Sequence, residues 1–166
     1  PNVKALSING ALFANAGADI VQELAFSLSA GVEYLTQLTG RGLSVSLVAP
    51  RLRFVFSSGS NYFFEIAKLR AARQLWAHIV KAYGPASDEL CKMNIHSITT
   101  VFNKTLYDPY VNMLRTTTEA MAATLGGADS REILPFDFAY GNTQEFGERI
   151  ARNQQLMLKE EAWFDK

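Results

Sequence analysis

The residues of this chain that could carry chemistry are few: two histidines, His78 and His96, and one cysteine, Cys91. Neither a His-x-Glu nor a His-Glu-x-x-His spacing occurs, and one thiol cannot form a disulfide within the chain, so we predict no metal site. His96 lies in an expected strand, near the carboxyl end where barrel enzymes place catalytic groups, although a structural role stays open. His78 lies between two apolar residues of an expected helix, which favours packing over chemistry.

Arg51 follows Pro50 beside an expected strand end. Its planar guanidinium suits a phosphate or a carboxylate, and an ordinary surface ion pair explains it equally well. The chain as a whole has no charge excess, because 16 Lys and Arg residues balance 16 Asp and Glu residues. This balance argues against nucleic acid or an anionic membrane as a partner. Because the sequence contains no run of about 18 apolar residues, we predict no membrane-spanning helix. We expect a globular, cytoplasmic chain that is part of a longer one.

Alternating strand and helix patterns divide the chain into four units. The expected strands cover residues 3–8, 43–49 or onward to 56, 92–98 and 132–134. The expected helices cover 19–38, then 62–83 after a polar turn at 57–61, then 108–125 with Asp108 as its N-cap, and a last helix to 163 after a capping box at 142–145. Apolar spacing assigns inner faces to the first two helices, namely Ile20, Leu24, Leu28, Val32 and Leu35, then Phe64, Ala67, Ala71, Leu75 and His78 or Ile79.

Strands that alternate with long helices predict an α/β fold with a parallel sheet and right-handed crossovers. Four such units fit either a small doubly wound sheet or half of an eight-stranded barrel. Asn9 and Gly10 end the first strand, and no glycine-rich phosphate loop follows them. That absence and the long first loop favour the barrel, while local pattern alone leaves both architectures open.

Four stretches resemble the substrate-binding barrel of the adenosylcobalamin-dependent acyl-CoA mutases, the methylmalonyl-CoA mutase family. They are DPYVNMLRTTTEAMAATLGG at 108–127, EIAKLRAARQLWA at 65–77, APRL at 49–52 and RIARN at 149–153. The resemblance runs over nearly the whole chain. It implies a (β/α)8 barrel with the acyl-CoA tail along its axis and the corrin ring over its carboxyl-end face. Residues 1–166 then correspond to four βα units, the C-terminal half of that barrel domain.

The departures from the family pattern concern its polar residues. The family's Tyr-His, whose His hydrogen-bonds the thioester carbonyl, is replaced by Ala11 and Leu12, so the resemblance implies no catalytic residue here. A family Gln is replaced by Ile98, and Phe138 stands where the family has a carboxylate. Among the polar positions, Arg51, His96 and Asp137 are retained. The resemblance makes Arg51 a CoA contact, on which any residual acyl-CoA binding should depend, and His96 a substrate-binding residue.

With these polar residues lost, the sequence is similar to the small, non-catalytic subunit of heterodimeric members of the family. The resemblance then implies a catalytic large subunit as partner, which holds the adenosylcobalamin and interconverts methylmalonyl-CoA and succinyl-CoA. This chain itself would hold neither cofactor nor metal. One alternative is that the chain is part of a catalytic adenosylcobalamin-dependent mutase that acts on another acyl-CoA. Another is a free-standing hydrolase or binding module that uses His96 and Asp137.

The half barrel would leave two strand edges open and one sheet face uncovered. We expect that uncovered inner face to be apolar, with Leu6, Ile8, Val45, Leu47 and Ile95 or their strand neighbours. Open edges and a large apolar patch both favour association, so the isolated chain is predicted to form a two-fold dimer.

Overall fold

The computed structural model describes residues 3–141 and 144–164. Its strands are β1 (Leu6–Asn9), β2 (Leu52–Ser58), β3 (Asn94–Thr99) and β4 (Ser130–Glu132). Its α-helices are α1 (Ala11–Asn15), α2 (Ile20–Gly40), α3 (Val45–Val48), α4 (Tyr62–Ala82), α5 (Val111–Leu125) and α6 (Glu145–Leu156). Short 3-10 turns cover Ala49–Arg51, Asp88–Cys91 and Phe138–Tyr140, and a π turn covers Met157–Glu161. Within the described ranges, no helix is both long enough and apolar enough to cross a bilayer.

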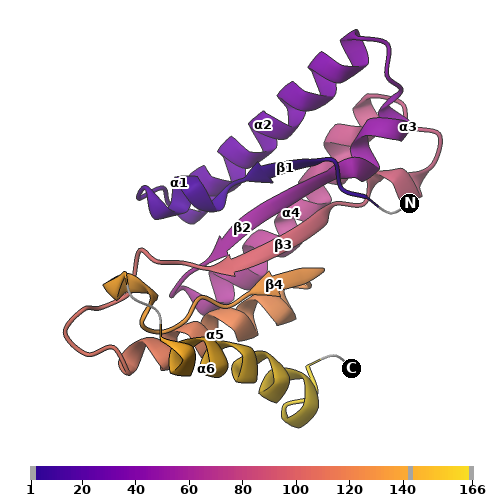
Figure 1. Ribbon diagram of the computed structural model, residues 1–166. Helices are drawn as coiled ribbons and strands as arrows, with labels where there is room; N and C mark the ends of the chain where they lie inside the picture. The colour runs from indigo at the N-terminus through magenta and orange to yellow at the C-terminus, as the bar shows by residue number, and fades with distance from the viewer. Residues whose placement is uncertain (1–2, 142–143, 165–166) are drawn as a thin grey trace.

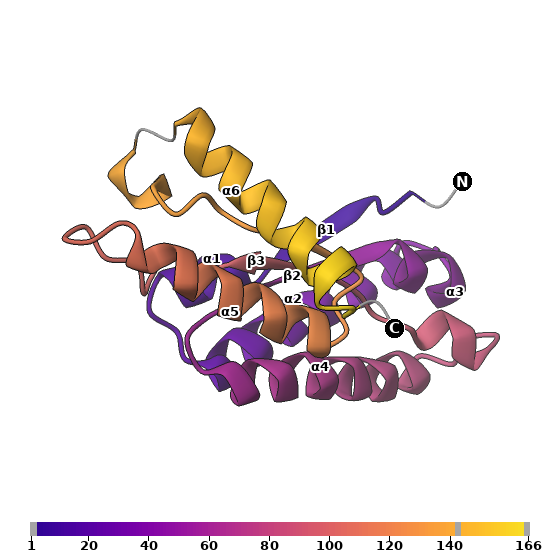
Figure 2. The ribbon, with the colours of Figure 1, turned by 90° about the horizontal axis from the view of Figure 1, so that it is seen from below.

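The four strands form one parallel sheet in the order β1-β2-β3-β4. Each strand therefore lies beside the next one in sequence, without the reversal of order that defines a doubly wound sheet. Figure 1 shows α4 and α5 behind the sheet, and Figure 2 shows α4, α5 and α6 following one another around its outside. This arrangement confirms the expected α/β fold of four βα units and resembles half of a (β/α)8 barrel.

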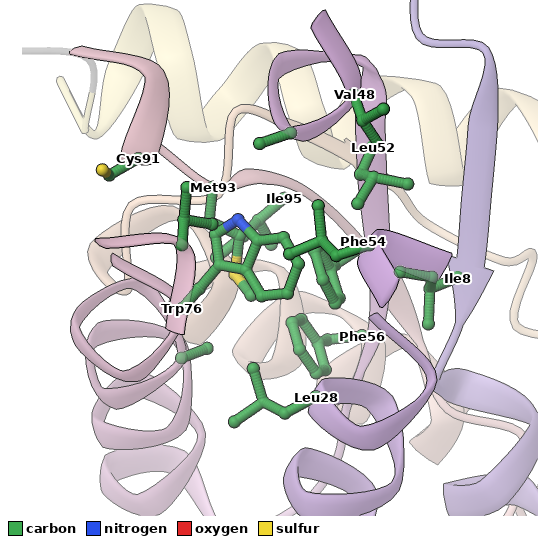
Figure 3. Close-up of a cluster of buried hydrophobic side chains, with 14 of the residues drawn as sticks. Ile8, Leu28, Val48, Leu52, Phe54, Phe56, Trp76, Cys91, Met93 and Ile95 are labelled. Carbon is green, nitrogen blue, oxygen red and sulfur yellow. The ribbon is translucent and has the colours of Figure 1, made fainter. Parts of the chain in front are cut away.

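The core lies between the sheet and the helices on its outer side (Figure 3). Phe54 and Phe56 point from β2 toward α4, where the Phe54 ring meets the Trp76 ring edge-on with centroids 4.7 Å apart. Gly31 of α2 permits this approach, because a Cβ atom there would lie 2.7 Å from the Trp76 ring. All three aromatic side chains are fully buried, so this cluster supplies much of the apolar burial that stabilises the sheet.

The predicted inner face of α4 is wrong by about one residue. Phe64 and Leu75 are 65% and 45% exposed, whereas the helix buries Glu65, Lys68, Leu69, Ala72, Trp76 and Val80. The buried face of α2 also differs from the expected apolar stripe, because it includes Glu23, Ser27 and Gly31 beside Leu28 and Leu35. Hydrophobic spacing missed these faces because charged residues lie in them and neutralise one another.

The second strand begins later than the first of the two predicted ranges. Residues 45–48 form α3, a 3-10 turn with Pro50 follows, and β2 starts at Leu52. A proline has no N–H to donate to a sheet ladder, which is consistent with the strand beginning only after it. Val45 and Leu47 are therefore helical, and Arg51 lies at the amino end of β2.

Two smaller boundaries also changed. Helix α5 starts at Val111 rather than at Asp108, whose carboxylate accepts a hydrogen bond from the Tyr110 N–H in the preceding turn. Strand β4 ends at Glu132, before the expected strand end at 134. The capping box predicted at 142–145 includes residues 142–143, which lie outside the described residues. A capping box does form at the start of α2, between Asp19 and Gln22.

The expected apolar inner face of the sheet is wrong. The parallel register pairs Leu6 with Leu52, and Ile8 and Ile95 with Phe54, so all of them face the helices. Side chains alternate between the two faces of a strand, and the opposite face is mainly polar. The argument for a dimer that relied on an apolar inner face is therefore wrong. The edge argument stays a prediction, because β1 and β4 each pair with one strand in the described structure.

Candidate functional site on the concave face

The uncovered, concave face of the sheet carries the side chains that alternate with the core residues. From β1 to β4 they are Ser7, Asn9, Arg53, Val55, Ser57, Asn94, His96, Ile98, Ser130 and Glu132. Of these ten, only Val55 and Ile98 are hydrocarbon side chains, so this face suits a polar ligand or ordered water.

His96 is the centre of a polar row on this face. Its Nδ1 lies 2.9 Å from the Ser130 hydroxyl, and its Nε2 lies 3.7 Å from a Glu132 carboxylate oxygen. Ser130 and Glu132 are two residues apart on β4 and so project from the same face. The row can hold a proton between a hydroxyl, an imidazole and a carboxylate.

The sequence prediction placed His96 near the carboxyl end of its strand, but it is the third of six residues in β3. Its partners Ser130 and Glu132 were missed altogether. The signal that could have found them is the Ser-x-Glu spacing, which a strand at 130–132 would place on one face. The predicted strand began at Glu132, which hid this spacing.

A second polar contact on the concave face comes from a residue that sequence reasoning did not select. The Arg53 Nε donates a hydrogen bond to the Asn94 Oδ1 at 3.0 Å, across the β2–β3 pair. The guanidinium is half-buried and fixed toward the amino end of the sheet. It therefore adds a positive charge to the part of the face that precedes His96 along the strands.

Arg51, the predicted CoA contact, lies apart from the His96 row. Its Nη1 donates a hydrogen bond to the Leu47 carbonyl oxygen at 2.9 Å, next to the amino end of β2. The strand register places His96 opposite Val55, four residues beyond Arg51. Four strand residues span about 13 Å, so the structure does not bring Arg51 and His96 into contact.

Asp137 does not join His96 either. Its Oδ2 accepts a hydrogen bond from the Gln144 N–H at 3.0 Å, at the start of α6. A carboxylate at a helix N-terminus satisfies a free N–H and interacts well with the helix dipole. The retained Asp137 thus positions α6, and the described contacts give no support to a hydrolase built from His96 and Asp137.

Gly147→Ala is expected to destabilise the protein by about 1–3 kcal/mol, although alanine normally favours a helix. A Cβ at Gly147 would lie 2.2 Å from Asp137 Oδ1, so the carboxylate that holds the start of α6 must move. Gly40→Ala is the matched control, because a Cβ there meets nothing within 4 Å. Urea titration should show Gly40→Ala as neutral or stabilising; the same result for Gly147→Ala would contradict this contact.

The rim at the carboxyl ends of the strands carries the positions where this chain departs from the family pattern. Ala11 is buried at the start of α1, whereas the Leu12 side chain is 65% exposed. Phe138, in the turn after β4, is 46% exposed. Ile98 lies on the concave face near the end of β3. Three hydrocarbon side chains thus stand at positions where a hydrogen-bond donor or a carboxylate was expected.

A buried ion network holds the carboxyl end of β2. The Lys68 ammonium lies 2.5 Å from a Glu23 carboxylate oxygen and 2.6 Å from a Glu65 carboxylate oxygen, and it donates to the Ser57 carbonyl at 2.8 Å. The other Glu23 oxygen accepts the Ser57 N–H at 2.6 Å. Burial raises the pKa of Glu23, and the neighbouring Lys68 opposes that rise. The network ties α2 and α4 to the strand end.

The same network borders a cavity of about 460 Å³ at the carboxyl ends of β2 and β3. The carboxyl groups of Glu23 and Glu65 contribute to its wall, together with the exposed rings of Phe64 and Phe102. Lys68 already engages both of these carboxylates, and the third carboxylate in the lining, Asp19, caps α2 by accepting the Gln22 N–H. We therefore assign these charged residues to folding and place the candidate site on the concave face and its rim.

A second buried pair fixes the loop after β3. The Lys104 ammonium lies 2.8 Å from a Glu119 carboxylate oxygen of α5, which also accepts a hydrogen bond from Asn103 at 2.7 Å. Burial raises the pKa of Glu119 and lowers the pKa of Lys104, and each residue offsets this effect for the other. Among the described residues, no group of three His, Cys, Asp or Glu side chains could hold a metal ion.

Comparison with known proteins identifies the family. A profile of the methylmalonyl-CoA mutase family matches residues 1–166. A methylmalonyl-CoA mutase small subunit from Porphyromonas gingivalis is 50% identical over 167 residues, covering 100% of this chain and 27% of that protein. A small subunit from Streptomyces virginiae is 42% identical, covering 98% of this chain and 26% of that protein. A methylmalonyl-CoA mutase from Escherichia coli is 41% identical, covering 98% and 23%.

The chain spans about a quarter of the length of these relatives. The family match nevertheless covers all 166 residues, including the β strands of the concave face and the rim that follows them. The resemblance drawn from the sequence is therefore confirmed, and the chain belongs to the methylmalonyl-CoA mutase family.

Proposed function

We propose that this chain is part of the non-catalytic small subunit of a heterodimeric, cytoplasmic methylmalonyl-CoA mutase. Its role is to support a large subunit that interconverts methylmalonyl-CoA and succinyl-CoA. The observation that carries the proposal is the exposed Leu12 side chain after β1. A hydrocarbon there cannot donate the hydrogen bond that a thioester carbonyl needs when negative charge develops on it.

The other rim positions support the same function. Ile98 and Phe138 likewise offer neither a donor nor a carboxylate to a reacting group. The two relatives named small subunits match the chain at 50% and 42% identity, over 100% and 98% of its length. Buried ion networks stabilise the fold of this chain while Leu12, Ile98 and Phe138 are apolar, as expected for a chain kept for folding and assembly.

Polar side chains in the middle of the concave face already contact one another. His96 is held by Ser130, and the Arg53 guanidinium is held by Asn94 on the same face. A ligand that passed along this face would have to displace both contacts or lie beyond them. We expect residual acyl-CoA binding to be weak, with Arg51 at the amino end of β2 as its remaining charged contact.

As a cobalt site, the described residues do not fit adenosylcobalamin. A histidine that ligates cobalt needs an accessible imidazole, and the His96 imidazole is half-buried in the row with Ser130 and Glu132. His78 is exposed on α4, on the helical outside of the sheet. The rim itself presents Leu12 and Phe138. We therefore assign the cofactor to the large subunit, and residues 1–166 to the C-terminal half of a barrel domain.

The deciding experiment is an adenosylcobalamin titration, followed by absorption spectroscopy, and a mutase assay on the full-length chain purified without its partner. We expect no corrin binding at micromolar concentration and no conversion of methylmalonyl-CoA. The purified large subunit, assayed with and without the full-length chain, is the positive control. Corrin binding together with turnover of any acyl-CoA by the full-length chain alone would favour the alternative of a catalytic mutase with a remade pocket.

A further inference from the structure

A separate aromatic cavity lies between the starts of α5 and α6. Its volume is about 290 Å³, and its lining includes four aromatic rings and one carboxylate, from Tyr110, Phe136, Tyr140, Phe146 and Asp137. These residues come from three segments: the start of α5, the turn after β4 and the first turn of α6. The cavity is distinct from the concave face and from the ion networks described above.

The rings stand at different angles around Phe136, which is buried at the base of the group. The Tyr110 ring stacks on Phe136 with centroids 5.6 Å apart and planes at 25°. The Phe146 ring meets Phe136 edge-on, with centroids 6.0 Å apart and planes at 81°. Tyr110 and Phe146 are 64% and 44% exposed, so part of each ring stays accessible in the described chain.

Among the described residues that line this cavity, the Asp137 carboxylate is the one charged group. The Asp137 carboxylate accepts the Gln144 N–H through Oδ2, while its buried Oδ1 has no hydrogen-bond partner among the described residues. Within that part of the chain, no Lys, Arg or His forms an ion pair with this carboxylate. The Phe146 ring already accepts a cation, because the Arg149 guanidinium lies 5.5 Å from its centroid.

We propose that this cavity binds a methylated ammonium group of trimethylammonium size. Aromatic faces attract a cation through the negative potential of the ring, and methylated ammonium ions lose less hydration than a bare ammonium when enclosed by rings. The Asp137 carboxylate adds long-range attraction without needing an N–H donor from the ligand. A volume of about 290 Å³ is at the lower end for ligand pockets, so it suits a headgroup and a short chain.

The test uses the full-length protein and two probes of the same shape. Choline carries the trimethylammonium charge, and 3,3-dimethylbutan-1-ol is its neutral carbon isostere. Ligand-observed NMR should show choline binding at least about tenfold more tightly than the neutral alcohol, because only choline gains the cation–π and carboxylate terms. Equal affinity of the two probes, or no choline binding at millimolar concentration, would overturn the proposal.

A matched pair of variants at the exposed Phe146 locates the site. Phe146→Leu keeps an apolar side chain but removes the ring, and should weaken choline binding about fivefold. Phe146→Tyr keeps the ring and should bind choline as the parent protein does. The proposal is independent of the mutase function, since neither substitution touches the concave face. Unchanged choline affinity in Phe146→Leu would show that the cation binds elsewhere and would reject this cavity.

Discussion

Replacing Lys68 with methionine should lower the free energy of unfolding by about 3–5 kcal/mol, although the two side chains are similar in length. The Lys68 ammonium is fully buried between the carboxylates of Glu23 and Glu65. Its removal leaves two buried negative charges together and releases the Ser57 carbonyl at the end of β2. Urea titration of the full-length protein measures the change.

The matched control for this substitution is Lys92→Met. Lys92 also pairs with a glutamate, Glu89, but both side chains are more than 70% exposed. Exposed pairs contribute roughly 0–1 kcal/mol, so this variant should be nearly as stable as the parent. Similar losses in the free energy of unfolding for the two variants would contradict the conclusion that the buried network stabilises the fold more than an exposed ion pair does.

The Lys68→Met loss should also depend on pH. Burial already raises the pKa of Glu23, and removing the adjacent positive charge raises it further. A carboxyl group whose folded-state pKa lies above its unfolded value is better tolerated when protonated. The variant should therefore recover stability as the pH falls from 7 toward the ordinary glutamate value of about 4.3.

Trp76→Ala is expected to cost about 3–5 kcal/mol, the usual range for removing a buried aromatic ring. Trp76 is fully buried. Its ring packs edge-on against Phe54 and lies close to Gly31, where the absence of a Cβ makes room for it. The cavity left behind would separate α4 from both α2 and β2. The midpoint of thermal or urea unfolding checks this.

Leu75→Ala, one residue earlier, is the control because apolar spacing assigned Leu75 to the inner face of α4. With a side chain that is 45% exposed, Leu75 should contribute about 1 kcal/mol or less. If Leu75→Ala lost more free energy of unfolding than Trp76→Ala, the orientation described for α4 would be contradicted. The face expected from hydrophobic spacing would then be favoured.

Much of the fold could be predicted from local sequence. Glycine and proline positions and long helical patterns gave four βα units, and the strands at β1 and β3 lie close to where they were expected. The family resemblance was also visible in continuous stretches such as 65–77 and 108–127, since it depends on residue identity rather than on contacts. These features are local in the chain, and sequence patterns are suited to finding them.

The orientation of the elements needed contacts between residues far apart in the chain. Glu23 and Lys68 are 45 positions apart, and their pairing is what allows charged residues to occupy the buried faces of α2 and α4. The start of β4 decided the candidate site in the same way. A strand at Ser130–Glu132, rather than one beginning at Glu132, places Ser130 beside His96.

The sequence by itself determined the family, the fold class and the apolar replacements at the rim, because each is a property of residue identity and order. The tertiary structure decided which face of the sheet is polar, because a strand's register sets which alternate side chains meet the helices. It also separated Arg51 from His96, since Pro50 belongs to a turn and puts Arg51 at the amino end of β2. The tertiary structure also assigned Asp137 to positioning α6. Its carboxylate accepts a hydrogen bond from the Gln144 N–H, at the residue that precedes the first turn of α6.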